Sequence, residues 1–164
     1  MKWDYEFDVV VVGSGNGALT AALCSHDGGA KTLVIEKSDQ FGGTSATSGG
    51  GVWIPNNRYA KAENVDDSTE DARDYINSVS PPGKIKDELV ETYLSEAPKM
   101  IDYLHENSQV KYRNLAHYPD YFPDNPGGKA GNRSMEPEPI YGTKLGKDLG
   151  KLREQHPQTA FTMG

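Results

Sequence analysis

The sequence predicts an α/β fold that begins with a β-α-β unit, and three observations support this prediction. Residues 9–12 are four consecutive valines, a β-branched run typical of a buried strand. A glycine-rich turn follows at 13–17, and the segment 19–26 after it is compatible with a helix. The apolar run at 32–35 supplies a second strand. A strand, a tight turn and a helix N-terminus in this order form a site for a dinucleotide pyrophosphate, because backbone N–H groups there attract anions.

The turn has the pattern G-x-G-x-x-A, and each small residue in it has a physical role. Gly13 permits the sharp turn, Gly15 lets the backbone approach a phosphate, and Ala18 allows the helix to pack closely on the strand. The pattern alone is weak, but Glu36 follows the second strand, close to the expected position about 20 residues beyond the turn. Its carboxylate can accept hydrogen bonds from ribose hydroxyls and would repel a 2′-phosphate, which disfavours NADP. The alternative is a solvated charge at a strand end.

The composition argues against some classes of partner. The formal charge of −7 and the pI near 5.0 disfavour binding to nucleic acid or to an anionic membrane. The single cysteine, Cys24, cannot form an internal disulfide, and its place in the first helix predicts a buried side chain. No signal peptide is visible and four valines cannot span a bilayer, so we expect a cytoplasmic protein without a transmembrane segment.

Apolar residues are few and unevenly distributed. They make up 35% of the chain, its mean hydropathy is −0.69, and the deficit is concentrated after Asn56. We therefore expect the first third to line a core and the rest to form surface helices and loops around a core supplied elsewhere. The last residues, 161–164, contain no closing helix or strand, which suggests a fragment.

A second glycine-rich segment occupies residues 41–51. Its glycines and hydroxyl side chains fit either a flexible linker or an ordered loop that passes close to a flat ligand. The ordered loop is favoured, because the segment directly follows the ribose-binding strand and continues into Trp53 and Ile54. Such a loop favours FAD over NAD, since a larger cofactor with two ends needs backbone contact beyond the first turn.

The middle of the chain predicts three helices, a strand and a stiff loop. A capping box at 68–71 begins the first helix, and Pro-Pro-Gly at 81–83 follows its end. A second helix is expected from about 84 to 95, and Pro98 is expected to open a third. Residues 110–115 fit a short strand.

The loop at 117–128 carries three prolines and three aromatic rings. Such rings suit a flat apolar ligand; the alternative, which the sequence alone favours, is that they only fix the loop to the domain surface.

The sequence carries no motif for metal, hydrolytic or phosphate-loop chemistry. The four histidines are isolated, and no cluster has the spacing of metal ligands. Neither a G-x-S-x-G elbow nor a G-x-x-x-x-G-K-[ST] loop is present. The difficult chemistry is therefore expected to belong to a bound dinucleotide.

Several motifs together resemble one flavoprotein family. They are Val12–Gly15, Glu36–Lys37, Gly42–Asn57, Pro119–Pro123 with Gly127–Gly128, Arg133–Pro137 and Lys144–Gly146. With them the chain resembles the family that contains succinate dehydrogenase, fumarate reductase and the 3-ketosteroid dehydrogenases, and it is most similar to the 3-ketosteroid Δ1-dehydrogenases. The W-I-P-N-N and P-D-Y-F segments are the more specific to the steroid branch.

The resemblance implies a Rossmann-like FAD-binding domain and places two glycine segments and one strand end at the cofactor. The expected cofactor-binding residues are Gly13, Ser14, Gly15, Asn16, Gly17, Ala18, Glu36, Lys37, Ser38, Gly43, Thr44, Ser45, Ser48, Gly49 and Gly50. Members with covalent flavin carry a histidine in the second glycine segment. This chain has none there, so FAD is expected to be non-covalent.

The resemblance also implies a catalytic role for Tyr121. In the ketosteroid dehydrogenases a second tyrosine, later in the chain, removes a proton beside the ketone while the flavin takes a hydride from the neighbouring carbon. The implied substrate is a small apolar ketone of steroid type, together with an electron acceptor. Members commonly have a second tyrosine where this chain has Phe122, which leaves substrate choice open.

Members of this family are much longer than 164 residues. We therefore interpret residues 1–164 as the N-terminal part of an FAD-binding domain, with the substrate domain absent. The alternatives are a fumarate-reductase-like flavoprotein or FAD ene-reductase, a non-catalytic FAD-binding fragment, and an NAD-dependent dehydrogenase. The last depends on the first turn alone.

Overall fold

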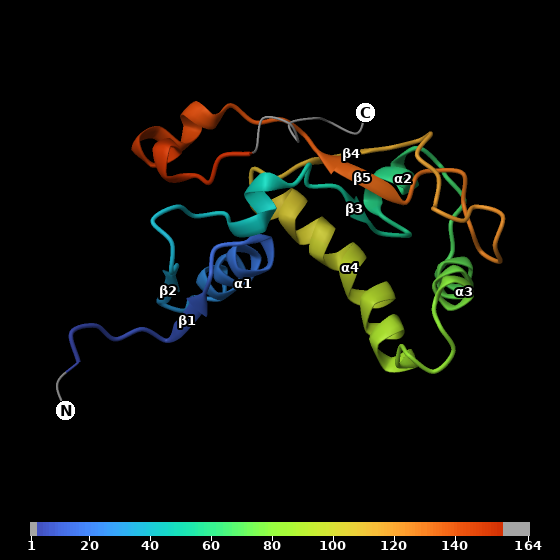
Figure 1. Ribbon diagram of the computed structural model, residues 1–164, viewed down its shortest axis with the longest axis horizontal. Coiled ribbons are helices and arrows are strands. Elements are labelled where there is room, and N and C mark those ends of the chain that lie inside the picture. Colours follow the sequence, from blue (N-terminus) through green and yellow to red (C-terminus); the bar gives the residue numbers. More distant parts are fainter. Residues whose placement is uncertain (1–2, 156–164) are drawn as a thin grey trace. The chain divides into compact units, whose positions relative to one another are not determined.

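The computed structural model describes residues 3–155. It divides into two compact units, residues 3–50 with 140–155, and residues 51–139, which we call the first and the second unit. Figure 1 shows the elements of each.

The first unit contains the predicted β-α-β start. Strand β1 (Val9–Val12) and strand β2 (Thr32–Ile35) pair in parallel, with Val9 opposite Thr32 and Val12 opposite Ile35. Helix α1 (Asn16–Asp27) connects them. Parallel neighbours joined by a helix are the smallest part of a Rossmann-like sheet, so the α/β prediction is confirmed.

Two short 3-10 segments complete the first unit. Segment η1 (Gly43–Thr47) lies within the second glycine-rich stretch, which is therefore an ordered loop rather than a linker. Segment η2 (Gly142–Lys151) was not predicted, and it consists of two helical pieces separated by a kink at Gly146. The chain after η2 runs beside Phe41, whose N–H donates to the Lys151 carbonyl at 2.9 Å.

The second unit contains a three-stranded antiparallel sheet in the order β3-β5-β4. Its strands are β3 (Val52–Trp53), β5 (Ser134–Pro137) and β4 (Tyr112–Asn114). Only β4 was predicted, within the segment 110–115. The other two are very short, and β5 lies far along the chain from the β3 strand that it pairs with.

Three helices accompany this sheet. Helix α2 (Arg58–Ala62) was not predicted, and the Asn57 side chain caps it by accepting from the N–H groups of Tyr59 and Ala60. Helix α3 (Thr69–Val79) begins as the capping box predicts, with the Ser68 hydroxyl accepting from the Asp71 N–H at 2.9 Å.

Helix α4 (Asp87–Asn107) corrects the prediction of two helices separated at Pro98. Proline was expected to open a new helix because it lacks an N–H and crowds the preceding turn. Here the helix continues through it, since Leu94, Ala97, Ile101 and Leu104 all lie buried on one face. Their burial offsets the lost hydrogen bond, and Pro98 lies in the helix interior.

The location of the core also differs from the prediction. Every buried apolar residue among those described lies between Ile54 and Met135, within the second unit. By contrast α1 has no buried residue, and Cys24, which was expected to be buried, is exposed. The physical reason is that a two-stranded sheet and a single helix cover little of each other, so Val12 remains 77% exposed.

Candidate functional site

The turn after β1 is tied to the end of β2 by a buried serine. Ser14 is 3% exposed, and its hydroxyl donates to a Glu36 carboxylate oxygen at 2.5 Å. The same hydroxyl accepts from the N–H of Gly42 at 2.9 Å. One side chain therefore connects the first glycine turn, the predicted ribose carboxylate and the start of the second glycine segment.

The Glu36 carboxylate is stabilised in its ionised form. The hydrogen bond from Ser14, followed by the bond from the Ser38 N–H at 3.0 Å, holds the pKa of Glu36 below its ordinary value. An ionised carboxylate can only accept hydrogen bonds. Glu36 is only partly buried, so it can also accept bonds from the hydroxyls of a ligand.

The second glycine segment reaches the N-terminus of α1. The N–H of Asn16 donates to the Ser45 hydroxyl at 3.0 Å. A Cβ added at Gly43 would lie 3.8 Å from Gly15, so the two backbones approach closely. No side chain caps α1 through its N-cap residue Gly15, and its first-turn N–H groups have no partner within the helix. The positive end of the helix dipole therefore lies beside two glycine-rich backbones, which is suitable for a pyrophosphate.

Three of these glycines require their residue type on conformational grounds. Gly13, Gly42 and Gly43 have φ values of +99°, +105° and +54°, in the region that side chains disfavour. At Gly42 an added Cβ would also lie 2.6 Å from the Cβ of Ala46. Gly42 was not among the predicted cofactor residues, although its N–H bond to Ser14 makes it part of the same turn.

The remaining predicted cofactor residues lie around this centre with fewer contacts. Lys37 and Thr44 are exposed, whereas Ser38 is partly buried and accepts from the Gln40 N–H at 3.1 Å. Ser48 accepts from the N–H of Gly50 at 3.1 Å. The structure thus brings the predicted residues into one unit, which also contains Gly17, Ala18 and Gly49.

The predicted catalytic residue, Tyr121, lies in the second unit, on the aromatic loop 117–129. Helix α3 holds this loop at several points. The Phe122 N–H donates to the Tyr75 hydroxyl at 3.3 Å, and Lys129 forms an ion pair with Asp71 at 2.8 Å. The loop is also closely packed, since a Cβ at Gly127 would lie 1.9 Å from the Asp71 carbonyl oxygen. The predicted attachment of the loop to the domain surface is therefore correct.

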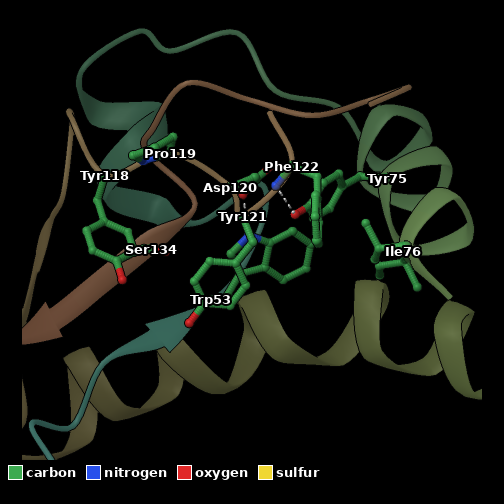
Figure 2. Close-up of a pocket in the computed structure, with 10 residues that line it drawn as sticks. Trp53, Tyr75, Ile76, Tyr118, Pro119, Asp120, Tyr121, Phe122 and Ser134 are labelled. Atoms are coloured by element: carbon green, nitrogen blue, oxygen red, sulfur yellow. Dashed lines mark hydrogen bonds between the residues drawn. The ribbon is translucent and has the colours of Figure 1, made fainter. Parts of the chain in front are cut away.

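The same loop also forms a pocket of about 290 Å³ with β3 and α3 (Figure 2). Its lining is mainly aromatic and aliphatic: Trp53, Tyr75, Ile76, Val79, Tyr118, Pro119, Asp120, Tyr121, Phe122 and Ser134. Tyr121 is 84% exposed and Phe122 58% exposed, so both rings can meet a ligand. The two interpretations of the loop are thus compatible, because it is fixed to the surface and lines a cavity there.

Behind the pocket lies an ion-pair cluster that the sequence did not reveal. Arg133 is 1% exposed and forms salt bridges with Asp67 at 2.7 Å and Asp120 at 2.9 Å. Asp120 also accepts from the indole N–H of Trp53 at 2.6 Å. The Arg133 guanidinium lies 5.5 Å from the Trp53 ring centre, within cation–π range. Pairings between such distant positions leave no periodic signal in a single sequence.

A comparison with protein-family models assigns the chain. Residues 8–163 match the model described as FAD binding domain. The chain belongs to this family. The first unit fits the cofactor in the name: it presents an ionised carboxylate for a ribose, and for a pyrophosphate a helix N-terminus whose N-cap residue, Gly15, has no capping side chain and lies beside glycine backbones. The individual contacts to FAD stay predictions.

Within the FAD binding domain family, the most informative likenesses are to ketone dehydrogenases. The 3-oxosteroid 1-dehydrogenase of Mycolicibacterium smegmatis is 40% identical over 96% of this chain and 28% of its own length. The 4-oxocyclohexanecarboxylate 2-dehydrogenase of Sinomonas cyclohexanicum is 37% identical over 96% of this chain and 27% of its own length. The chain thus spans about a quarter of the length of these relatives.

A solved structure shows the same relation in three dimensions. The 3-ketosteroid Δ1-dehydrogenase of Sterolibacterium denitrificans, in complex with 1,4-androstadiene-3,17-dione, matches with a TM-score of 0.87 and 42% identity. The match covers 93% of this chain and 27% of that one. None of the helices in residues 3–155 is long and apolar enough to cross a membrane.

Proposed function

We propose that this chain is the N-terminal, cofactor-binding part of an FAD-dependent dehydrogenase that introduces a double bond into the ring of a 3-ketosteroid. The observation that carries the proposal is the likeness to a 3-ketosteroid Δ1-dehydrogenase along nearly the whole chain, at 42% identity. The aromatic pocket beside Tyr121 supports it, because a flat apolar ring system suits such a lining. The substrate domain and the proton-abstracting tyrosine are proposed to lie in sequence beyond these residues.

In this proposal the first unit holds FAD without a covalent bond. Glu36 accepts from the adenosine ribose, and the N–H groups at the start of α1 face the pyrophosphate. The loop 43–50 continues this contact toward the flavin. FAD, when bound, supplies the acceptor for a hydride, and a separate electron acceptor must reoxidise it after each turnover. The protein contributes binding, orientation and the charge of Glu36.

The second unit contributes the proposed catalytic residue. Tyr121 exposes most of its ring and can donate its hydroxyl hydrogen to a bound ketone substrate. Phe122 has no hydroxyl, so it offers apolar contact alone. A hydrogen bond to the ketone oxygen favours the enol form and thereby makes the proton on the neighbouring carbon easier to remove.

The pocket favours an apolar ketone over a carboxylate substrate. No lysine or arginine is among its lining residues in the described part of the chain, and its one carboxylate, Asp120, is already paired with Arg133. Fumarate or 4-oxocyclohexanecarboxylate would bring a negative charge into this lining without a counter-charge, which is unfavourable. Together with the likeness to a 3-ketosteroid Δ1-dehydrogenase, this lining supports a steroid substrate over the fumarate-reductase-like alternative.

The proposal can be tested with the full-length gene product. We expect a yellow protein that releases free FAD on acid precipitation and whose flavin absorbance changes when 4-androstene-3,17-dione is added. With an artificial electron acceptor it should desaturate this steroid, whereas fumarate and 4-oxocyclohexanecarboxylate should give little turnover. Reduction of fumarate without any response to steroid would contradict the proposal. Flavin that stays with the precipitated protein would contradict only the proposal that FAD is bound without a covalent bond, and the rest of the proposed function would stand.

A further inference from the structure

The Asp120 carboxylate lies directly before Tyr121 and is held from three directions. It accepts from the Trp53 indole N–H at 2.6 Å, from the Lys129 N–H at 3.0 Å and from Arg133 at 2.9 Å. The Asp120 side chain is 2% exposed. A buried carboxylate with this many donors cannot rotate without leaving some of them unpaired, which is costly.

These bonds connect the two sides of the pocket. Trp53 comes from β3, whereas Asp120 and Tyr121 come from the aromatic loop, and all three line the cavity (Figure 2). The Asp120 N–H also donates to the Lys129 carbonyl at 3.0 Å, so the ends of the loop segment 120–129 are joined at this residue. The backbone at Tyr121 is therefore held one residue away, by a buried carboxylate.

Trp53 is fixed on its other faces as well. Its ring stacks on Tyr93 at 6.4 Å and 9° and contacts Tyr75 at 5.8 Å. Arg133 lies over both Trp53 and Tyr75, at 5.5 and 5.8 Å from the ring centres. The indole N–H thus points from a rigid ring to Asp120.

We propose that Asp120, held by Arg133, is a positioning residue that holds the backbone at Tyr121 in place for the reaction, in the pocket that Tyr121 and Trp53 both line. This inference rests on the proposed function of the pocket. It differs from a merely structural role, in which Arg133 and its two carboxylates would stabilise the unit without affecting the geometry at Tyr121.

The chain offers a matched control, because Arg133 has two carboxylate partners. Asp67→Asn and Asp120→Asn each remove one charge from the same buried arginine and retain the side-chain size. Only Asp120 contacts Trp53 and adjoins Tyr121; Asp67 instead accepts from the N–H groups of Asn56 and Ser68. A purely structural cluster predicts similar effects of the two changes, and a positioning role predicts different ones.

The experiment compares both variants in the full-length, FAD-loaded protein. With saturating 4-androstene-3,17-dione we expect Asp120→Asn to lower kcat about tenfold or more, because small displacements of a catalytic group are costly. Asp67→Asn should keep kcat close to that of the unchanged protein, and both should retain their flavin. Equal kcat in the two folded variants would overturn the positioning role.

Hydrogen exchange supplies a readout that does not need turnover. The amides of Asp120, Tyr121 and Phe122 should exchange about tenfold faster in Asp120→Asn and remain unchanged in Asp67→Asn. If the unchanged protein does not respond to steroids but the two variants differ in exchange as described, the proposed function fails while the loop-positioning role of Asp120 stands. Unchanged exchange in Asp120→Asn overturns that role. If Asp120→Asn does not fold, Trp53→Phe removes the indole donor from Asp120 and keeps a smaller aromatic ring at this position, and the same exchange comparison decides.

Discussion

Ser14 shows how much one hydroxyl can determine at the predicted cofactor site. Its hydrogen bond makes the largest contribution to the lowered pKa of Glu36, and its hydroxyl also accepts a hydrogen bond from the N–H of Gly42. Because the pKa is lowered in the folded protein, the ionised Glu36 stabilises the fold at pH above its ordinary pKa, and this contribution is lost as the pH falls through the folded value. The charge that would hold a ribose is thus maintained by a side chain from the turn after β1, 22 residues away in the sequence.

Replacing this serine should change the pH dependence of flavin binding. In Ser14→Ala the pKa of Glu36 rises toward its ordinary value, so on acidification Glu36 becomes protonated at a higher pH. We expect the full-length variant to release FAD at a higher pH than the unchanged protein, as measured by flavin fluorescence during an acid titration. Ser25→Ala, which removes a hydroxyl that bonds only within α1, is the control. Identical release by both variants would separate Glu36 from cofactor binding.

Gly15 tests the proposed pyrophosphate position. Its φ is −72°, which any residue can adopt, and a Cβ there would lie 3.4 Å from the Ser45 hydroxyl, an ordinary contact. Gly15→Ala should therefore fold normally. In Gly15→Val the branched side chain extends to the space beside Ser45, and we expect FAD affinity to fall about tenfold to a hundredfold. Titration of the apoprotein with FAD measures this. Unchanged FAD affinity in the folded valine variant would show that the pyrophosphate does not bind beside Gly15.

At the scale of elements, local signals predicted well and long-range pairing did not. The β1-α1-β2 start and the α3 cap depend on residues close together in the sequence, and both were found. The β3-β5-β4 sheet joins Val52 to Met135, and its strands are too short to show an alternating pattern. The Arg133 cluster could not be predicted for the same reason, because its partners come from segments that lie far apart in the sequence.

Packing of α4 keeps Pro98 inside a helix, although proline locally disfavours helix, and this lowers the stability of the second unit. Proline in a helix interior is about 3 kcal/mol less favourable than alanine. Pro98→Ala should restore an N–H to the Leu94 carbonyl, and we expect it to stabilise the second unit by about 1–2 kcal/mol after the loss of ring contacts. The midpoint of urea unfolding measures this. Lys99→Ala, at an exposed position beside it, should change stability by less than about 0.5 kcal/mol. A destabilised Pro98→Ala would mean that the ring packing outweighs the hydrogen bond.

At the scale of the whole molecule, the two units differ in how completely they are covered. The second unit buries a cluster of Ile54, Ala97, Ile101 and Met135, and we expect this packing to slow local opening. The first unit leaves β1 and β2 largely uncovered, with Val10 53% and Ile35 43% exposed. The prediction that the first third lines the core was wrong for this reason. Four consecutive valines indicate a buried strand, but their burial depends on covering elements that the described residues of the first unit do not include.

This difference predicts how residues 1–164 behave when they are produced alone. A two-stranded sheet is marginally stable in water, so the amides of Val9–Val12 should exchange rapidly with solvent while those in the middle of α4 remain protected. The same chain should not desaturate a 3-ketosteroid, because it spans about a quarter of the relatives' length and lacks the proposed proton-abstracting tyrosine. Native-state hydrogen exchange and a steroid assay with an artificial acceptor measure the two effects. Equal protection of β1 and α4 would show that the first unit is stable without further cover, and steroid turnover by the isolated chain would show that the catalytic groups all lie within it.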